Sequence, residues 1–202
     1  MKLRELLLDV ATSRREFEDD PQQFLEILVG AAALYPVFDG WPSPVDEWLE
    51  EAERLGREVD AGAAPELWQE TMGLLAVRRA IVAMRRRNQE GALRALEAAR
   101  QPGMPPRVRL WEATTRARVH VRQHAFDEAE RALAEAGSYV HEAGDNPEAY
   151  RTLATGLSIA RRLGLASAEA LFRIQVNRMR DVVLGPERFD RMVEDLLRQS
   201  KQ

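Results

Sequence analysis

Apolar residues along this chain recur every three or four positions, which is the spacing of one face of an α-helix. Helix-starting pairs such as Asp20-Pro21 and helix-ending pairs such as Gly185-Pro186 divide the pattern into segments. No segment shows the sustained alternation of a half-buried strand, so we expect no β-sheet. The pattern predicts about ten helices joined by short loops, at 2–18, 21–35, 44–58, 65–87, 89–101, 108–123, 126–143, 147–163, 168–184 and 186–200.

The chain also contains an internal repeat. Shifted by 37 residues, the stretch 76–100 falls on 113–137, and ten of these 25 positions carry identical residues. Several of the identical residues are small or apolar and stand three or four apart, as on one helix face. A period in this range is typical of stacked supersecondary units. The identical pairs are Ala76/Ala113, Arg79/Arg116, Ala80/Ala117, Val82/Val119, Arg85/Arg122, Ala92/Ala129, Arg94/Arg131, Ala95/Ala132, Leu96/Leu133 and Ala99/Ala136.

The second copy of the repeat resembles a known family. In RARVHVRQHAFDEAERALAEA, a helix with Ala117 ends in a short polar turn, and Phe126 opens a second helix with Leu133 and Ala136. This segment is similar to a degenerate tetratricopeptide repeat, a helix-turn-helix unit with small residues where its helices cross. RRNQEGALRALEAA resembles a second copy, and 154–177 resembles a third. The resemblance implies an all-α fold, a right-handed α-solenoid of about ten antiparallel helices.

The same resemblance implies how the chain is organised. We expect a single helical-repeat domain over 1–202, with degenerate N-terminal helices at 1–60, a repeat core at 65–180 and a capping helix at 186–200. The capping helix has apolar residues on one side and charged residues on the other, as a terminal repeat requires. Such closed ends favour a monomer, and a dimer through the acidic end remains the alternative.

The resemblance also implies a function. Repeats of this family usually hold an extended peptide or a helix of a partner protein in a concave groove lined by the first helix of each pair. Guanidinium groups bind carboxylates in a bidentate manner, so we expect an acidic peptide or helix as the ligand of a scaffold or adaptor protein. The alternative is that these arginines are solvated or pair with nearby glutamates. The expected partner-binding residues are Arg85, Arg118, Arg122, Arg162 and Trp111.

Charge is distributed unevenly along the chain, although the net charge is only −4. Residues 1–75 carry 6 basic and 17 acidic side chains, whereas residues 76–125 carry 12 basic and 3 acidic ones. This segregation either steers a charged partner or lets the acidic end pack against the basic middle. The sequence leaves both interpretations open.

The basic middle supports a second hypothesis from another class, a regulatory module that faces nucleic acid. Its arginines would contact phosphates, although the acidic first third and the lack of aromatic residues among the arginines count against this role. Binding to phosphates predicts a strong dependence of affinity on salt. The arginines available for this role are Arg78, Arg79, Arg85, Arg86, Arg87, Arg107, Arg109 and Arg116.

Residues that carry chemistry are few. The absence of cysteine excludes disulfides and zinc-thiolate sites. His120 and His124 stand four apart on one predicted helix, but HVRQH lacks the glutamate of a metalloprotease motif, so we expect no metal site. We also expect no cofactor, no catalytic residue and no enzymatic activity. No apolar run approaches the ~20 residues of a membrane span. The first residues, MKLRELLLDV, lack a signal-peptide cleavage site, which predicts a cytoplasmic protein.

Overall fold

The computed structural model describes residues 17, 20–32, 45–59, 62, 65–144 and 147–179. All regular structure in these ranges is helical, which confirms the expected all-α class for this part of the chain. The predicted helix 186–200 and almost all of 2–18 lie outside the described residues. The elements are α2 (Pro21–Ala32), α3 (Val45–Glu58), α4 (Pro65–Arg85), α5 (Gln89–Ala98), α6 (Pro106–Arg122), α7 (Phe126–Gly137), the short 3-10 helix η2 (Val140–Glu142), α8 (Pro147–Leu163) and α9 (Ala166–Met179).

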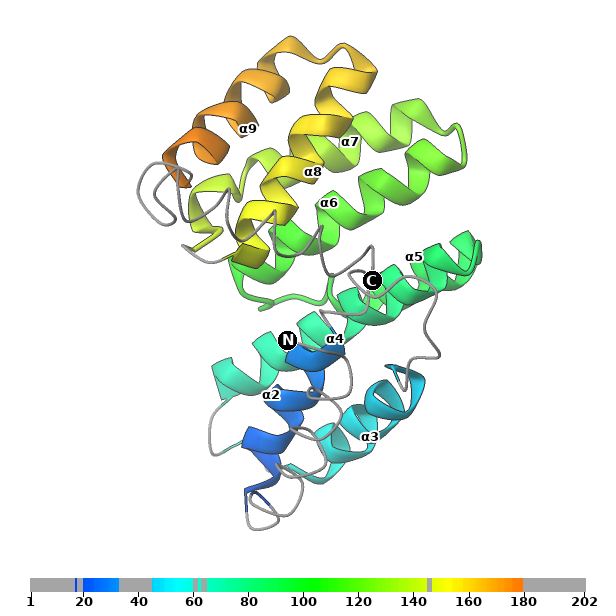
Figure 1. Cartoon of the computed structure of the whole chain (residues 1–202), viewed down its shortest axis with the longest axis vertical. Helices are drawn as coiled ribbons and strands as arrows, with labels where there is room; N and C mark the ends of the chain where they lie inside the picture. Colours follow the sequence, from blue (N-terminus) through cyan, green and yellow to red (C-terminus); the bar gives the residue numbers. More distant parts are fainter. Residues whose placement is uncertain are drawn as a thin grey trace, which may run out of the picture.

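The helices in the described residues are arranged in four pairs. In each pair, α2/α3, α4/α5, α6/α7 and α8/α9, the second helix packs along the first (Figure 1). The last three pairs follow one another in chain order, because α4 packs against α6 and α6 packs against α8. The helices α4, α6 and α8 therefore form a continuous row, which we call the inner row.

One turn closes each of the last three pairs. Its central residue has a positive φ, 61° at Arg87, 59° at His124 and 69° at Gly164. The next backbone N–H donates to a carbonyl five positions earlier, as in a Schellman motif. These bonds run from Asn88 to Ala83 (2.9 Å), from Ala125 to His120 (3.0 Å) and from Leu165 to Ala160 (2.9 Å). The first two turns obey the 37-residue register found in the sequence.

The hydrophobic core has two parts that meet at α4. The N-terminal part is built by α2 and α3, and α4 contributes Leu75 and Val82 to it. The larger part runs through α4 to α9, and α4 contributes Ala80 and Met84 to it. Because α4 is apolar on two sides, it joins the N-terminal pair to the three pairs that follow.

Two glycines let the helices of this core approach closely. A Cβ built on Gly73 of α4 would lie 2.5 Å from Val108 Cγ1 of α6. A Cβ on Gly156 of α8 would clash with the ring of Phe172 on α9. Gly73 therefore allows α4 and α6 of the inner row to pack closely. Gly156 allows the same between α8 and α9 of the last pair.

Two of the predicted helix starts can be checked directly. Asn88 caps α5 as expected, because its side-chain oxygen accepts from the backbone N–H of Gly91 at 2.8 Å. The predicted start at 168, with Ser167 as its cap, is wrong, since α9 begins at Ala166 and Ser167 lies inside its first turn. Leu165, the residue after Gly164, takes the N-cap position, because its carbonyl accepts from the backbone N–H of Glu169 at 2.8 Å.

Candidate functional site

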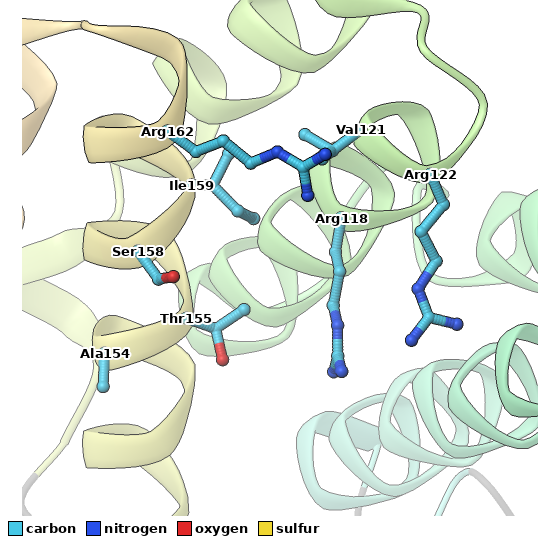
Figure 2. A pocket seen from close by; sticks show the side chains of 8 residues that line it. All are labelled: Arg118, Val121, Arg122, Ala154, Thr155, Ser158, Ile159 and Arg162. Carbon is cyan, nitrogen blue, oxygen red and sulfur yellow. The ribbon is translucent and has the colours of Figure 1, made fainter.

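An open cavity of about 480 Å³ lies between α6 and α8 of the inner row. Three guanidinium groups, two hydroxyl groups and a few aliphatic side chains surround it (Figure 2). We call this the arginine cavity. Its lining residues are Arg118, Val121, Arg122, Ala154, Thr155, Ser158, Ile159 and Arg162.

Three of the four arginines expected in the groove line this cavity. Arg118 and Arg122 extend from α6 side by side, and Arg162 reaches from α8 toward Val121 (Figure 2). Within the described residues, Arg118 and Arg162 make no side-chain hydrogen bond or ion pair. Arg122 donates to the backbone carbonyl of Met84 at 2.8 Å, so it also caps a carbonyl in the last turn of α4.

The cavity is positively charged without a compensating carboxylate among the described residues. Desolvation, followed by the charges of Arg122 and Arg85, lowers the pKa of Arg118 below its usual value. Arg85 is thus close enough to act on the cluster, although it does not line the cavity. Cations that repel one another in a partly desolvated site favour the binding of an anion.

The fifth expected residue, Trp111, lies elsewhere. Its side chain is buried, with 1% of its surface exposed, and it belongs to the core between the helix pairs. Arg78 and Arg107 cover its ring, with guanidinium carbons 5.4 and 4.7 Å from the ring centroid. Because the indole is enclosed by the core and by two cations, it offers no surface to a partner, and we remove Trp111 from the candidate site.

The acidic end packs against the basic middle at several points. Arg79 of α4 pairs with Glu53 of α3, and Arg107 pairs with Glu70 at 3.0 Å. Arg86, the residue after α4, donates to Asp46 Oδ1 of α3 at 2.9 Å. The charge segregation of the sequence is therefore used, at least in part, within the fold.

A buried ionic network joins the helices of the middle pair. Glu112 is fully buried and accepts from Arg116 Nε at 2.8 Å, and Arg116 also pairs with Glu135 of α7. Arg109 donates to the same Glu135 at 2.7 Å. Desolvation raises the pKa of Glu112, and the neighbouring Arg116 opposes that shift. Because each carboxylate is matched by an arginine, we assign this network to the stability of the pair.

The two histidines of HVRQH do not share a helix face. α6 ends at Arg122, and His124 lies in the turn with its left-handed φ of 59°. The expected i, i+4 arrangement on one helix is therefore wrong, because the Schellman turn redirects the chain between them. Among the described residues, no group of three potential metal-binding side chains lies close together.

Sequence reasoning missed the contribution of α8 to the cavity. Thr155, Ser158 and Ile159 line it together with Arg162, although the sequence analysis selected only Arg162. Their spacing from Arg162 is that of one helix face, so the face itself was the available signal. Which side of α8 faces α6 depends on how the pairs stack, and the local sequence does not state this.

Comparison of the chain with protein-family models, with curated proteins and with solved structures gives no match. None of the helices in the described residues is long and apolar enough to cross a membrane. The inner row and its arginines are therefore the features that bear on function.

Proposed function

We propose that this chain is a protein-interaction scaffold or adaptor that binds an acidic peptide or helix of a partner protein. The arginine cavity carries the proposal, because Arg118, Arg122 and Arg162 surround it without a carboxylate partner among the described residues. The aliphatic side chains of Val121 and Ile159 add apolar contact area beside the charges. This combination suits a carboxylate that is carried on a peptide chain.

The architecture that we propose for this role is a tetratricopeptide-like solenoid. The turn that recurs at Arg87, His124 and Gly164 supports it, as does the ordered packing of α4, α6 and α8. In such an array the first helix of each pair lines the concave face, and the arginine cavity lies between two of these helices. Three features remain predictions: the number of about ten helices, the right-handed sense of the array and the cytoplasmic location.

A nucleic-acid-facing role has less support. It would need the arginines of the basic middle as a row of phosphate contacts. Arg78 is buried, Arg79 pairs with Glu53, and Arg86 is hydrogen-bonded to Asp46. Ion pairs with glutamates of α4, α6 and α7 likewise hold Arg107, Arg109 and Arg116. The carboxylates that neutralise these arginines would repel a phosphate backbone, which favours a peptide ligand.

The proposal is tested by affinity capture with the purified chain as bait, in lysate with and without nuclease treatment. Mass spectrometry identifies the retained proteins, and the double variant Arg118→Glu/Arg162→Glu serves as a second bait. We avoid Arg122 because its bond to Met84 also caps the last turn of α4. A matched control, Arg94→Glu/Arg131→Glu, reverses two exposed arginines on α5 and α7 that pair only with glutamates of their own helix in the described structure.

We expect proteins that the wild type and the control retain and that the groove variant loses, with an acidic segment in common. Circular dichroism confirms that both variants keep the helical content of the wild type. Equal retention by the groove variant would contradict the proposal. Retention that disappears on nuclease treatment would favour the nucleic-acid hypothesis instead.

A further inference from the structure

The helix α8 carries a second arginine on the face that lines the arginine cavity. Arg151, Thr155, Ser158 and Arg162 follow the spacing i, i+4, i+7 and i+11, which places all four along one stripe of the helix. Thr155, Ser158 and Arg162 line the cavity, so Arg151 continues the same face beyond it. With a rise of 1.5 Å per residue, the Cα atoms of Arg151 and Arg162 are about 16 Å apart along the helix.

Arg151 lies beside further cations of the inner row. Arg78 of α4 and Arg107 of α6 stack on the ring of Trp111, and Arg107 is paired with Glu70. Desolvation, followed by the charges of Arg151 and Arg107, lowers the pKa of Arg78 below its usual value. Arg151 is therefore near enough to act on Arg78, and a second group of positive charges lies at this end of the row.

The Arg151 side chain is itself available for binding. Residue 151 is exposed, and its side chain makes no hydrogen bond or ion pair within the described residues. Partial desolvation by its surroundings lowers the pKa of Arg151, which indicates that the guanidinium lies along the protein surface and is only partly hydrated. An exposed guanidinium near the buried cation Arg78 is a site where a carboxylate gains both a bidentate partner and a favourable potential.

We propose that Arg151 forms a second anionic subsite, so that the groove recognises an extended acidic segment with two carboxylates about four to six residues apart. The inference rests on the proposed function and specifies its ligand. An extended chain advances about 3.3 Å per residue, so five residues cover the 16 Å from Arg162 to Arg151. A helical ligand would need about eleven residues to cover the same distance, because a helix advances only about 1.5 Å per residue.

Synthetic peptides test this spacing directly. Fluorescein-labelled peptides of glycine, serine and leucine carry either one glutamate or two glutamates separated by two, five, eight or eleven positions. Fluorescence anisotropy at low salt measures Kd for the full-length chain. We expect the five-position peptide to bind about tenfold more tightly than the one-glutamate peptide, and the other spacings to show little gain.

Two single variants assign the gain to its residue. Arg151→Gln should reduce the advantage of the five-position peptide over the one-glutamate peptide to less than about twofold, with both Kd values measured on the variant. Arg131→Gln, an exposed arginine of α7 that pairs with Glu128 at 3.0 Å, should keep the wild-type values for both peptides.

The outcomes separate the two proposals. If all spacings bind equally, or if Arg151→Gln keeps the gain, the second subsite is refuted and the acidic groove stands. If the eleven-position peptide binds best, the ligand is helical and the extended segment is refuted. If none of the peptides gives saturable binding, or if Arg118→Gln leaves the one-glutamate peptide unaffected, the proposed function fails and the second subsite fails with it.

Discussion

Arg87 and His124 stand 37 residues apart and hold the same left-handed backbone conformation, with φ of 61° and 59°. Each follows the first helix of a pair, and each precedes a residue whose N–H closes a Schellman turn. Gly164 occupies the corresponding place in the last pair with φ of 69°. The same turn therefore recurs in the last three pairs, whereas the residue at its left-handed position differs. A residue with a Cβ is strained in that conformation.

The turn gives a test of that strain. Arg87→Gly should raise the free energy of unfolding by about 0.5–1 kcal/mol, because relief of the left-handed strain exceeds the entropy that glycine gains in the unfolded chain. Gly164→Ala should lower it by about 1 kcal/mol, and steric contact plays no part there because no atom lies within 4 Å of an added Cβ. Urea denaturation measures both.

The control for this pair is Gln123→Gly, one position before His124. Gln123 has right-handed helical angles, φ −84° and ψ −1°. Glycine relieves no strain at this position, so the variant should be less stable than the wild type by about 1 kcal/mol. A similar loss of stability in Arg87→Gly would refute the strain at the turn.

The contact between Gly156 and Phe172 predicts that alanine at position 156 destabilises the chain. Alanine in place of an ordinary helix glycine has the opposite effect. Gly156→Ala should destabilise the chain by about 1–3 kcal/mol, because the added methyl group clashes with the ring. Gly30→Ala in α2 has open space around its Cβ and should stabilise by up to about 1 kcal/mol. Thermal unfolding followed by circular dichroism compares the two, and stabilisation by both would show that α8 and α9 are not closely packed.

Removal of a carboxylate from a buried ion pair should lower the free energy of unfolding more than removal from an exposed pair. Glu112 is fully buried against Arg116, so Glu112→Gln removes a charged hydrogen-bond partner from Arg116, which keeps its pair with Glu135, and should cost about 2 kcal/mol of unfolding free energy. Glu53 pairs with Arg79 with 42% of its side chain exposed, and Glu53→Gln should cost less than about 1 kcal/mol. Chemical denaturation at neutral pH tests the order, and equal effects would contradict the burial of the network.

The stability of the chain should also depend on pH through His120. Desolvation lowers the pKa of His120 below its ordinary value of 6.5, so the unfolded chain binds the proton more tightly than the folded chain does. This contribution to stability is present above pH 6.5 and is lost as the pH falls toward the folded-state pKa. Between pH 7.5 and 5.5, Tm should fall more for the wild type than for His120→Gln, and parallel curves would refute the assignment.

The helices and their order were predictable because their signals are local. The positions of α2 to α9 follow from apolar periodicity, from proline at helix starts such as Pro21 and Pro65, and from caps such as Asn88. The break between α6 and α7 was located correctly at Phe126. The left-handed turn before it was not foreseen, because His124 carries none of glycine's preference for a positive φ.

The candidate site was predictable only in part. Arg118, Arg122 and Arg162 were selected from the register of the repeat, and they line one cavity because helix periodicity fixes which residues share a face. Trp111 was selected by the same argument and is buried, because the side chains that cover a residue come from other helices. Arg151 was not selected, since its neighbour Arg78 lies 73 positions away in the chain.

The sequence by itself determined the helical class, the repeat register and the face on which each arginine of the inner row stands. These properties follow from hydrogen bonds and side-chain periodicity within a few residues. The tertiary structure decided which charges meet, since Glu53 reaches Arg79 and leaves Arg118 without a carboxylate among the described residues. The reason is that a charged side chain on an isolated helix is surrounded by water. Only the stacking of the pairs decides which arginine lies within reach of a carboxylate and which does not.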